Sequence, residues 1–350
     1  MSLSKKWKKF WDNESFVYLR VWMKNFRNKE FFSKKNIFQV HINGEENMGA
    51  AVYKIWIDGG EAGFFALQRF VLDGLYVADV CGFKPYILIT NTKYNRTSAV
   101  DDNMFDYYYD QPCYSSAVLN QSCCVIDFDL DHRRWLEDQF VTGDGMLSGY
   151  EFKPELIERL AQIKQKYLHL NKTASSRLEK DYLKVLDDRK TLGIHFRGNA
   201  FSIGFKDHPV GLVPEDYFEY IDEAMRNGFE KIFVATDDSR ALNGFKERYE
   251  EHIVCYDDTT RSTDSIDVHD HRDSYGKDGQ QIGYEVLRDM MTLSRCSGLI
   301  CGKSQVSFAV LIEKGARDES FEYIKVIDKG VYSNDSKAVE KYMDSIEKYK

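Results

Sequence analysis

The feature that most constrains the fold of this chain is a regular alternation of short apolar runs with amphipathic segments between residues 191 and 326. Short apolar runs bounded by turn residues predict buried strands, and apolar residues spaced by three and four predict helices. We expect strands at 191–195, 231–235, 252–255, 299–301 and 323–326, and helices at 214–227, 240–249, 281–296 and 305–314. Strands that alternate with helices form a mostly parallel sheet with helices on both faces. This part of the chain is therefore predicted to be a doubly wound, Rossmann-like α/β domain.

A second α/β unit is predicted nearer the start of the chain. Residues 52–57 alternate as a strand does, residues 64–81 carry apolar side chains at helical spacing, and residues 85–90 form another apolar run. A strand, a helix and a strand in succession predict two parallel strands. The glycines of the intervening turn, Gly60 and Gly63, would let a ligand approach the backbone. They do not match GxGxxG, and a simple tight turn is the alternative.

We place the domain boundary near residue 190. The segment before it, residues 150–189, is charged and helical in pattern, and the regular alternation begins directly after it. The chain is thus divided into an N-terminal α/β domain at 1–190, a C-terminal Rossmann-like domain at 191–335 and a terminal helix at 336–350.

Charge and cysteine usage exclude several classes of protein. The formal net charge is −8, whereas a general nucleic-acid-binding protein carries a broad basic surface. The seven cysteines show no CxxC spacing, which is typical of thiols in a reducing compartment and not of a disulfide framework or a zinc site. The sequence shows no secretory signal and no run of 18 apolar residues, so we expect a cytoplasmic protein.

Two aromatic segments allow more than one interpretation. Residues 5–11, KKWKKFW, could form a basic helix that touches the inner membrane surface peripherally, or a helix that docks on the protein itself. Residues 101–115 interleave acids with Met104, Phe105 and the tyrosines at 107–109. Aromatic rings flanked by carboxylates suit a sugar-binding surface, and a packed loop or a short helix is the alternative.

Candidate site residues stand at the end of the strand predicted at 191–195. His195 and Arg197 are two positions apart, so on a strand their side chains project to the same face. Ligands of open α/β sheets bind outside the carboxyl ends of the strands, and a guanidinium there presents a rigid fork to a phosphate or diphosphate. Gly198 and Asn199 suit the turn that follows. The alternative is a surface arginine paired with a carboxylate.

Two further strand ends carry polar side chains that could line the same crevice. They are Asp237 and Asp238 after one strand, and Lys303, Ser304 and Gln305 after another. The free N–H groups at the start of a helix suit an anionic oxygen, and an aspartate could hold a ribose, read a guanine edge or join a set of metal ligands. The alternative at both places is simple helix capping.

Three motifs, in this order, resemble the inverting fucosyltransferase superfamily. They are HFRG at 195–198, VATDDS at 234–239 and LRDMMTLSRCSGLICGKSQVSFAV at 287–310. They are most similar to the α-1,6-fucosyltransferases, including the nodulation fucosyltransferases, and in the N-terminal half only the segment GEAGFFALQRF resembles the family. The resemblance implies a GT-B fold, with two Rossmann-like domains facing a cleft. It also implies a GDP-fucose donor on the C-terminal domain, inversion at the anomeric carbon, and no metal or other cofactor.

Carried over residue by residue, the resemblance implies that Arg197 holds the β-phosphate and that His195 contacts the nucleotide. Asp238 would read guanine or ribose. The general base would be Asp207 or His208, in the loop FSIGFKDHPVG. The remaining donor contacts would come from Asn199, Lys206, Asp237, Lys303, Ser304 and Gln305.

The resemblance thus implies a glycosyltransferase that moves fucose from GDP-fucose to a glycan acceptor, such as a cell-surface polysaccharide or oligosaccharide, held by the N-terminal domain. Many family members carry a second arginine and an aspartate after the first arginine, where this chain has Gly198 and Asn199. One alternative is therefore a catalytically impaired relative that binds a GDP-sugar or a glycan. Another is an unrelated dinucleotide-dependent enzyme, which the absence of GxGxxG disfavours.

Overall fold

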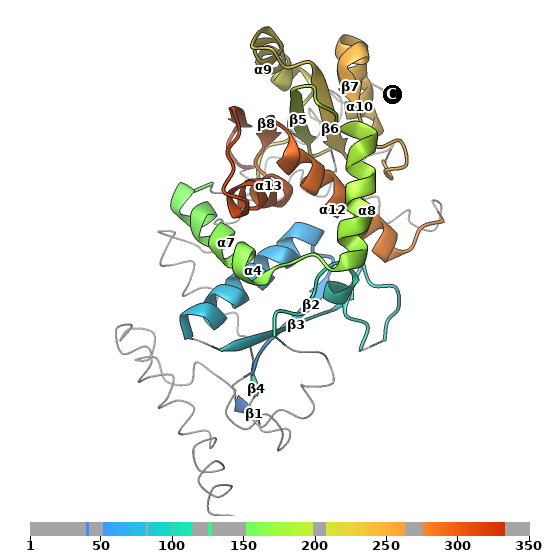
Figure 1. Cartoon of the computed structure of the whole chain (residues 1–350). Helices are drawn as coiled ribbons and strands as arrows, with labels where there is room; N and C mark the ends of the chain where they lie inside the picture. The colour runs from blue at the N-terminus through green and yellow to red at the C-terminus, as the bar shows by residue number, and fades with distance from the viewer. Residues whose placement is uncertain are drawn as a thin grey trace, which may run out of the picture. The chain divides into compact units, whose positions relative to one another are not determined.

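The chain divides by its internal contacts into two units, each described here by itself (Figure 1). The first consists of Met1–Gly145 with Gln162–Asn171, and the second of Met146–Ala161 with Lys172–Lys350. The computed structural model describes residues 40–41, 52–81, 83–99, 101–113, 125–127, 152–198, 208–262 and 276–332. The predicted segments at 5–11 and 336–350 lie outside the described residues. Across the ranges that are described, no helix has the length and apolarity needed to cross a membrane.

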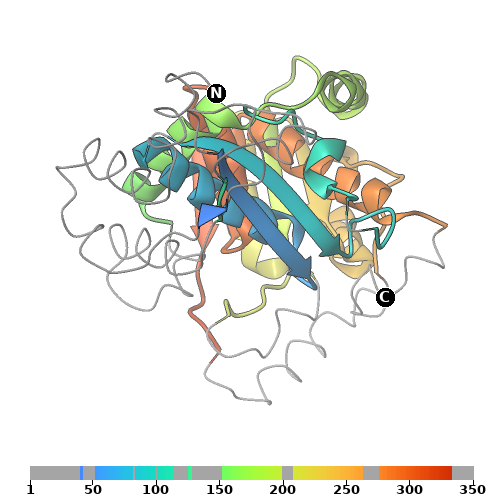
Figure 2. The same ribbon diagram turned by 90° about the horizontal axis from the view of Figure 1, so that it is seen from below.

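The first unit is built on a small mixed sheet. Its elements are β1 (Val40–His41), β2 (Val52–Gly60), α4 (Phe64–Cys81), β3 (Lys84–Thr92), the 3-10 helix η1 (Met104–Tyr107) and β4 (Val125–Asp127). The strand order is β1-β4-β2-β3, with β2 parallel to both β3 and β4, and β1 antiparallel to β4. Figure 2 shows β2 and β3 side by side and pointing the same way. The predicted unit of strand, helix and parallel strand is confirmed.

The glycine turn of this unit is shorter than predicted, because β2 continues as far as Gly60, where φ is +47°. The carbonyl of Gly63 accepts hydrogen bonds from the N–H groups of Ala66 and Leu67 at 2.9 and 3.1 Å, and so begins α4. Among the described residues, an added Cβ on Gly60 or Gly63 would meet no atom within 4 Å. The geometry is that of a tight turn, and a ligand-binding role for the two glycines stays a prediction.

Most of the aromatic side chains around η1 pack inward. Met104, Phe105, Tyr108 and Tyr109 are each 7% exposed or less. The ring of Tyr108 lies edge-on to that of Phe64 on α4, with 5.4 Å between the ring centroids. Such edge-to-face pairs are typical of a packed core. This packing favours the alternative of a packed loop or short helix for the described residues 101–113.

The second unit holds a five-stranded sheet in the order β7-β6-β5-β8-β9, and every pair of neighbouring strands is parallel. After α7 (Pro154–Tyr167), which contributes residues to both units, the elements are α8 (Lys172–Val185), β5 (Thr191–Phe196), α9 (Glu215–Arg226), β6 (Lys231–Thr236), α10 (Ser239–Tyr249), η4 (Glu250–His252), β7 (Ile253–Val254), α12 (Gly279–Arg295), β8 (Gly298–Gly302), α13 (Gln305–Ala316) and β9 (Tyr323–Ile327). Helix α8 packs against α12, where Tyr284 donates to Asp181 at 2.7 Å. The unit therefore begins before the boundary that the sequence places near residue 190.

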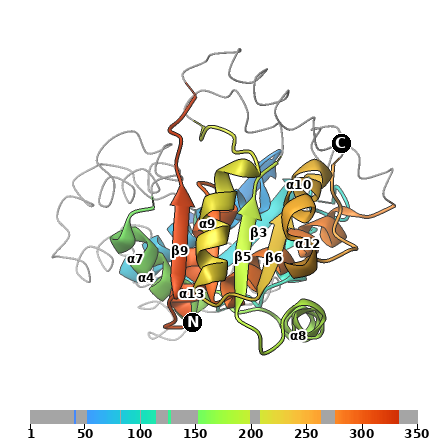
Figure 3. The ribbon, with the colours of Figure 1, turned by 90° about the horizontal axis from the view of Figure 1, so that it is seen from above.

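The chain adds strands on one side of β5 as far as β7, and then on its other side as β8 and β9. Figure 3 shows α9 and α10 over one face of this sheet, with α12 and α13 behind it. Helices on both faces confirm the predicted doubly wound sheet. The winding reverses between β5 and β8, and such a reversal leaves a crevice at the carboxyl ends of the strands, where open α/β sheets bind their ligands.

The central strand β5 is buried along its whole length because helices cover both of its faces. Phe196 packs against Tyr217 and Phe245 of α9 and α10, with ring centroids 5.7 and 5.8 Å apart. His195, one residue earlier, points to the opposite face and bonds to Ser307 on α13. Side chains alternate across a strand, so Arg197 follows His195 on the α13 side.

Candidate functional site

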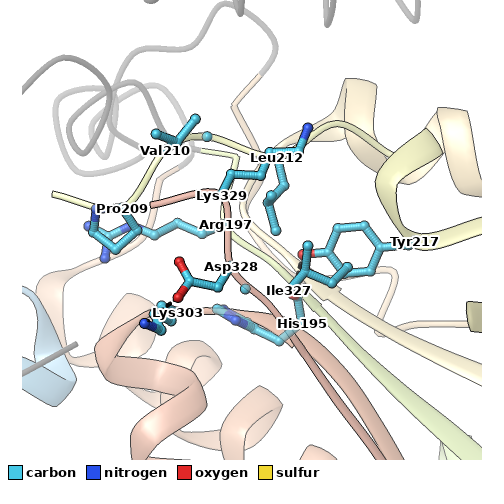
Figure 4. Close-up of a pocket in the computed structure, with 12 residues that line it drawn as sticks. His195, Arg197, Pro209, Val210, Leu212, Tyr217, Lys303, Ile327, Asp328 and Lys329 are labelled. Atoms are coloured by element: carbon cyan, nitrogen blue, oxygen red, sulfur yellow. Dashed lines mark hydrogen bonds and ion pairs between the residues drawn. The ribbon is translucent and has the colours of Figure 1, made fainter. Parts of the chain in front are cut away.

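A pocket lies at the carboxyl edge of the sheet in the second unit, where the winding reverses (Figure 4). Its wall is formed by the ends of β5, β8 and β9 and by the segment that leads into α9. The lining residues are His195, Arg197, Pro209, Val210, Gly211, Leu212, Tyr217, Gly302, Lys303, Ile327, Asp328 and Lys329. The structure thus brings three of the residues predicted at strand ends, His195, Arg197 and Lys303, into one pocket.

Arg197 places a permanent positive charge in this pocket. Its side chain is partly exposed, and it makes no hydrogen bond or ion pair with another residue that the structure describes. The predicted alternative, a surface arginine paired with a carboxylate, is therefore not found among the described residues. A guanidinium in this state can offer its donors to an anionic ligand, and its planar fork matches two phosphate oxygens.

His195 is buried and neutral, and its hydrogen bonds indicate which ring nitrogen carries the proton. The Ser307 hydroxyl donates to the Gly302 carbonyl at 2.8 Å, so its oxygen is free to accept from His195 Nδ1, which lies 2.9 Å away. We infer that Nδ1 carries the hydrogen and that Nε2 holds a lone pair. Burial, and then the charge of Arg197, lower the pKa of His195 to about 3. A neutral imidazole with a free Nε2 accepts a hydrogen bond from a ligand hydroxyl or N–H.

Ser304 is a helix cap, as its alternative interpretation predicts. Its Oγ accepts a hydrogen bond from the Ser307 N–H at 3.0 Å, and the residue is 1% exposed. The same oxygen lies 3.0 Å from Ser307 Oγ and 3.4 Å from His195 Nδ1. Neither Ser304 nor Gln305, the first residue of α13, lines the pocket. Ser304 therefore supports the polar cluster behind His195 and does not line the pocket.

Asp238 does not line the pocket, and it has the capping role given above as its alternative, so its reading of guanine or ribose stays a prediction. It is 1% exposed and caps α10 by accepting from the Arg240 N–H at 2.9 Å. Its two oxygens also accept hydrogen bonds from the Arg240 guanidinium, from Nε at 3.0 Å and from Nη2 at 2.6 Å. A carboxylate that accepts three hydrogen bonds from one buried arginine has a structural role.

Gly198 is required for close packing and not for an unusual backbone turn. It is absent from the residues with positive φ, and its N–H donates to Asp237 Oδ1 at 3.1 Å. A Cβ added to Gly198 would lie 2.2 Å from Cβ of Asp238. The end of β5 thus passes directly over the turn between β6 and α10. Asp237 holds that turn further, because its carbonyl accepts from the Ser262 N–H at 2.7 Å.

Two charged lining residues, Asp328 and Lys329, were not found from the sequence. They follow β9, just as Lys303 follows β8, so the rule of polar residues after a strand applies to them equally. Lys303 Nζ lies 2.5 Å from Asp328 Oδ2, and Lys329 Nζ lies 2.6 Å from Asp216 Oδ1. The ammonium of Lys303 holds the pKa of Asp328 below its usual range.

The loop predicted to hold the general base is described only from His208 onward; Asn199, Lys206 and Asp207 lie outside the described residues. The carbonyl of His208 accepts from the Tyr332 N–H at 2.9 Å, which joins the loop to the chain after β9. His208 adjoins the lining residue Pro209 without being part of the lining. In the described part of the chain, no three His, Cys, Asp or Glu side chains cluster as metal ligands do.

The structure is similar to solved fucosyltransferase structures, although no family model and no curated protein matches the chain. The fucosyltransferase NodZ from Bradyrhizobium aligns over 77% of this chain and 92% of its own, with 16% identity and a TM-score of 0.42. POFUT1 in complex with GDP-fucose aligns over 81% and 99%, with 11% identity and a TM-score of 0.42. A mutant of Arabidopsis thaliana FUT1 in complex with GDP aligns over 89% and 78%, with 11% identity and a TM-score of 0.39. At TM-scores below 0.5, the similarity assigns no role to any residue of this chain.

Proposed function

We propose that this chain is a glycosyltransferase whose second unit binds a nucleoside diphosphate sugar in the pocket at the carboxyl edge of its sheet. The observation that carries the proposal is the Arg197 guanidinium, which faces the pocket without an ion pair to any other described residue. A parallel sheet binds its ligand at the reversal of its winding, and Arg197 stands there.

The pocket's chemistry suits a diphosphate that bears hydroxyl groups. Arg197 and Lys303 supply two positive charges, and His195 supplies a neutral acceptor beside them. A phosphate oxygen is a hydrogen-bond acceptor and finds no donor on His195 Nε2, whereas a ribose or hexose hydroxyl can donate its hydrogen to the lone pair of that nitrogen. An anionic group next to a hydroxyl is the pattern of a nucleotide sugar.

The reaction we propose is the transfer of fucose from GDP-fucose to a glycan acceptor, with inversion at the anomeric carbon. The choice of donor rests on the three motifs of the C-terminal half and not on pocket shape. When the sugar leaves, its diphosphate gains negative charge, and a fixed guanidinium with a neighbouring ammonium stabilises that charge without needing a metal ion. A base near the acceptor hydroxyl would take its proton, and His208 and Asp207 remain the proposed candidates.

The test combines binding and turnover for Arg197→Gln. A charge-assisted contact to phosphate contributes about 1.5–3 kcal/mol, so we expect the dissociation constant for GDP to rise by about 10- to 150-fold. Transfer from GDP-fucose should fall below detection while the melting temperature of the free protein stays within about 2 °C. Binding of GDP is measured by calorimetric titration, and binding of a panel of nucleotide sugars is measured by the shift in melting temperature.

A matched control is Arg189→Gln, since Arg189 precedes β5 at the opposite edge of the same sheet and pairs with Asp187 at the surface. It should bind GDP as the unchanged protein does. The proposal fails if millimolar GDP neither shifts the melting temperature nor gives a binding isotherm, or if Arg197→Gln binds GDP normally.

A further inference from the structure

We propose that Asp328 is a built-in counter-anion that competes with the ligand's diphosphate for Lys303, and so weakens the pocket's hold on the nucleotide. This inference rests on the proposed function, because it takes the ligand to be a nucleoside diphosphate. It adds a residue that sets affinity and therefore the ease with which the product diphosphate leaves.

The fold places Lys303 and Asp328 side by side. Gly302 and Ile327 are partners in the register of β8 and β9, so the next residue on each strand emerges at the same edge. Lys303 Nζ lies 2.5 Å from Asp328 Oδ2, and Asp328 Oδ1 accepts from the Gly330 N–H at 2.9 Å. Both oxygens of the carboxylate are thus held in place.

The pair lies within the pocket and not beside it. Lys303 and Asp328 both line the pocket, and Figure 4 shows the Asp328 carboxylate between Lys303 and Arg197. Lys329 differs, since its partner Asp216 is not a lining residue. Among the described lining residues, Asp328 thus carries a negative charge beside three cations, and its partner Lys303 is one of them.

The consequence for binding follows from the charges. A diphosphate that reaches both Arg197 and Lys303 must take the ammonium from Asp328 or share it, and it also meets the repulsion of the carboxylate. An asparagine at this position keeps the shape and the acceptor for Gly330 but removes the charge. Since a partly exposed ion pair contributes little, we expect Asp328→Asn to tighten binding by about two- to fivefold.

The experiment titrates GDP and, separately, inorganic diphosphate into the full-length protein and into Asp328→Asn. Both ligands should bind the variant more tightly, and Asp328→Ala should show the same direction. The control is Glu322→Gln, which removes a similar pair with Lys190 (2.7 Å) at the other end of β9 and should leave both affinities unchanged. A purely structural role for Asp328 would change the melting temperature but not tighten either ligand.

Weaker or unchanged binding of both ligands by Asp328→Asn would overturn the inference, and weaker binding would indicate that Asp328 contacts the ligand directly. Failure of the proposed function looks different. In that case the unchanged protein does not bind GDP, while inorganic diphosphate still reports whether Asp328 competes for Lys303. Binding of neither ligand to any of the proteins would refute both proposals.

Discussion

Replacing Gly198 by alanine tests the argument that the end of β5 is pressed against the turn that begins α10. The added Cβ would lie 2.2 Å from Cβ of Asp238, 3.0 Å from its Cγ and 3.1 Å from its Oδ2. Carbon atoms in contact stand about 3.5–4.0 Å apart, so the two segments must move apart by about 1.5 Å. Moving Asp238 is costly, because its carboxylate forms an ion pair with the buried Arg240.

The expected loss of stability follows from which segment moves. If β5 shifts, the overpacking costs about 1–3 kcal/mol. If the carboxylate leaves Arg240 instead, breaking a buried ion pair costs about 3–5 kcal/mol. The protein adopts the less costly of these two adjustments, so we expect Gly198→Ala to lower the free energy of unfolding by about 1–3 kcal/mol, measured by urea denaturation. It should also weaken GDP binding, because Arg197 is the preceding residue.

The control for this variant is Gly63→Ala, where the added Cβ meets no described atom within 4 Å and φ is not positive. Its effect should stay within about 1 kcal/mol. If Gly198→Ala lowers the free energy of unfolding by less than about 0.5 kcal/mol, the end of β5 can move to accommodate a Cβ, and the explanation for the glycine is wrong.

Two further predictions concern protonation. Ser307→Ala removes the acceptor of His195 Nδ1–H, so nitrogen NMR should show the neutral ring shifting toward the Nε2–H form; an unchanged tautomer would contradict the hydrogen-bond assignment. Burial raises the pKa of Asp289 from 3.8 to about 7, so the folded state binds more protons than the unfolded state between these values and unfolding becomes easier as pH rises through that window. Asp289→Asn should therefore stabilise the protein more at pH 8 than at pH 4, as measured by urea denaturation at both pH values; equal effects at the two pH values would contradict the assignment.

The secondary structure of the second unit could be predicted because its signals are local. The apolar run KIFVA predicts a strand over 231–235, and β6 spans Lys231–Thr236. The helix expected over 305–314 is α13, Gln305–Ala316. A buried parallel strand must be apolar on both faces, and a covering helix must repeat its apolar residues every three or four positions. Those requirements mark the sequence wherever the fold imposes them.

The roles of polar side chains at strand ends could not be predicted in the same way. An aspartate before a helix reads identically whether it caps the helix or faces a ligand. The difference for Asp238 is its pairing with Arg240, which depends on the arginine turning back into the core. Likewise, the aromatic residues around η1 carry no sign in the sequence of which way their rings point.

Arg197 and Lys303, two of the cationic residues of the pocket, differ in the contacts that hold them in place. Arg197 stands between a buried histidine, fixed by Ser307, and a glycine, fixed by Asp237 and by contact with Asp238. Its backbone therefore cannot withdraw from the pocket, although its own guanidinium has no partner among the described residues. Lys303 has the opposite arrangement, since its charge is already matched by Asp328. A diphosphate would thus bind the guanidinium of Arg197 directly, but it would have to compete with Asp328 for the ammonium of Lys303. Removing the charge of Arg197 should therefore weaken binding, and removing the charge of Asp328 should tighten it.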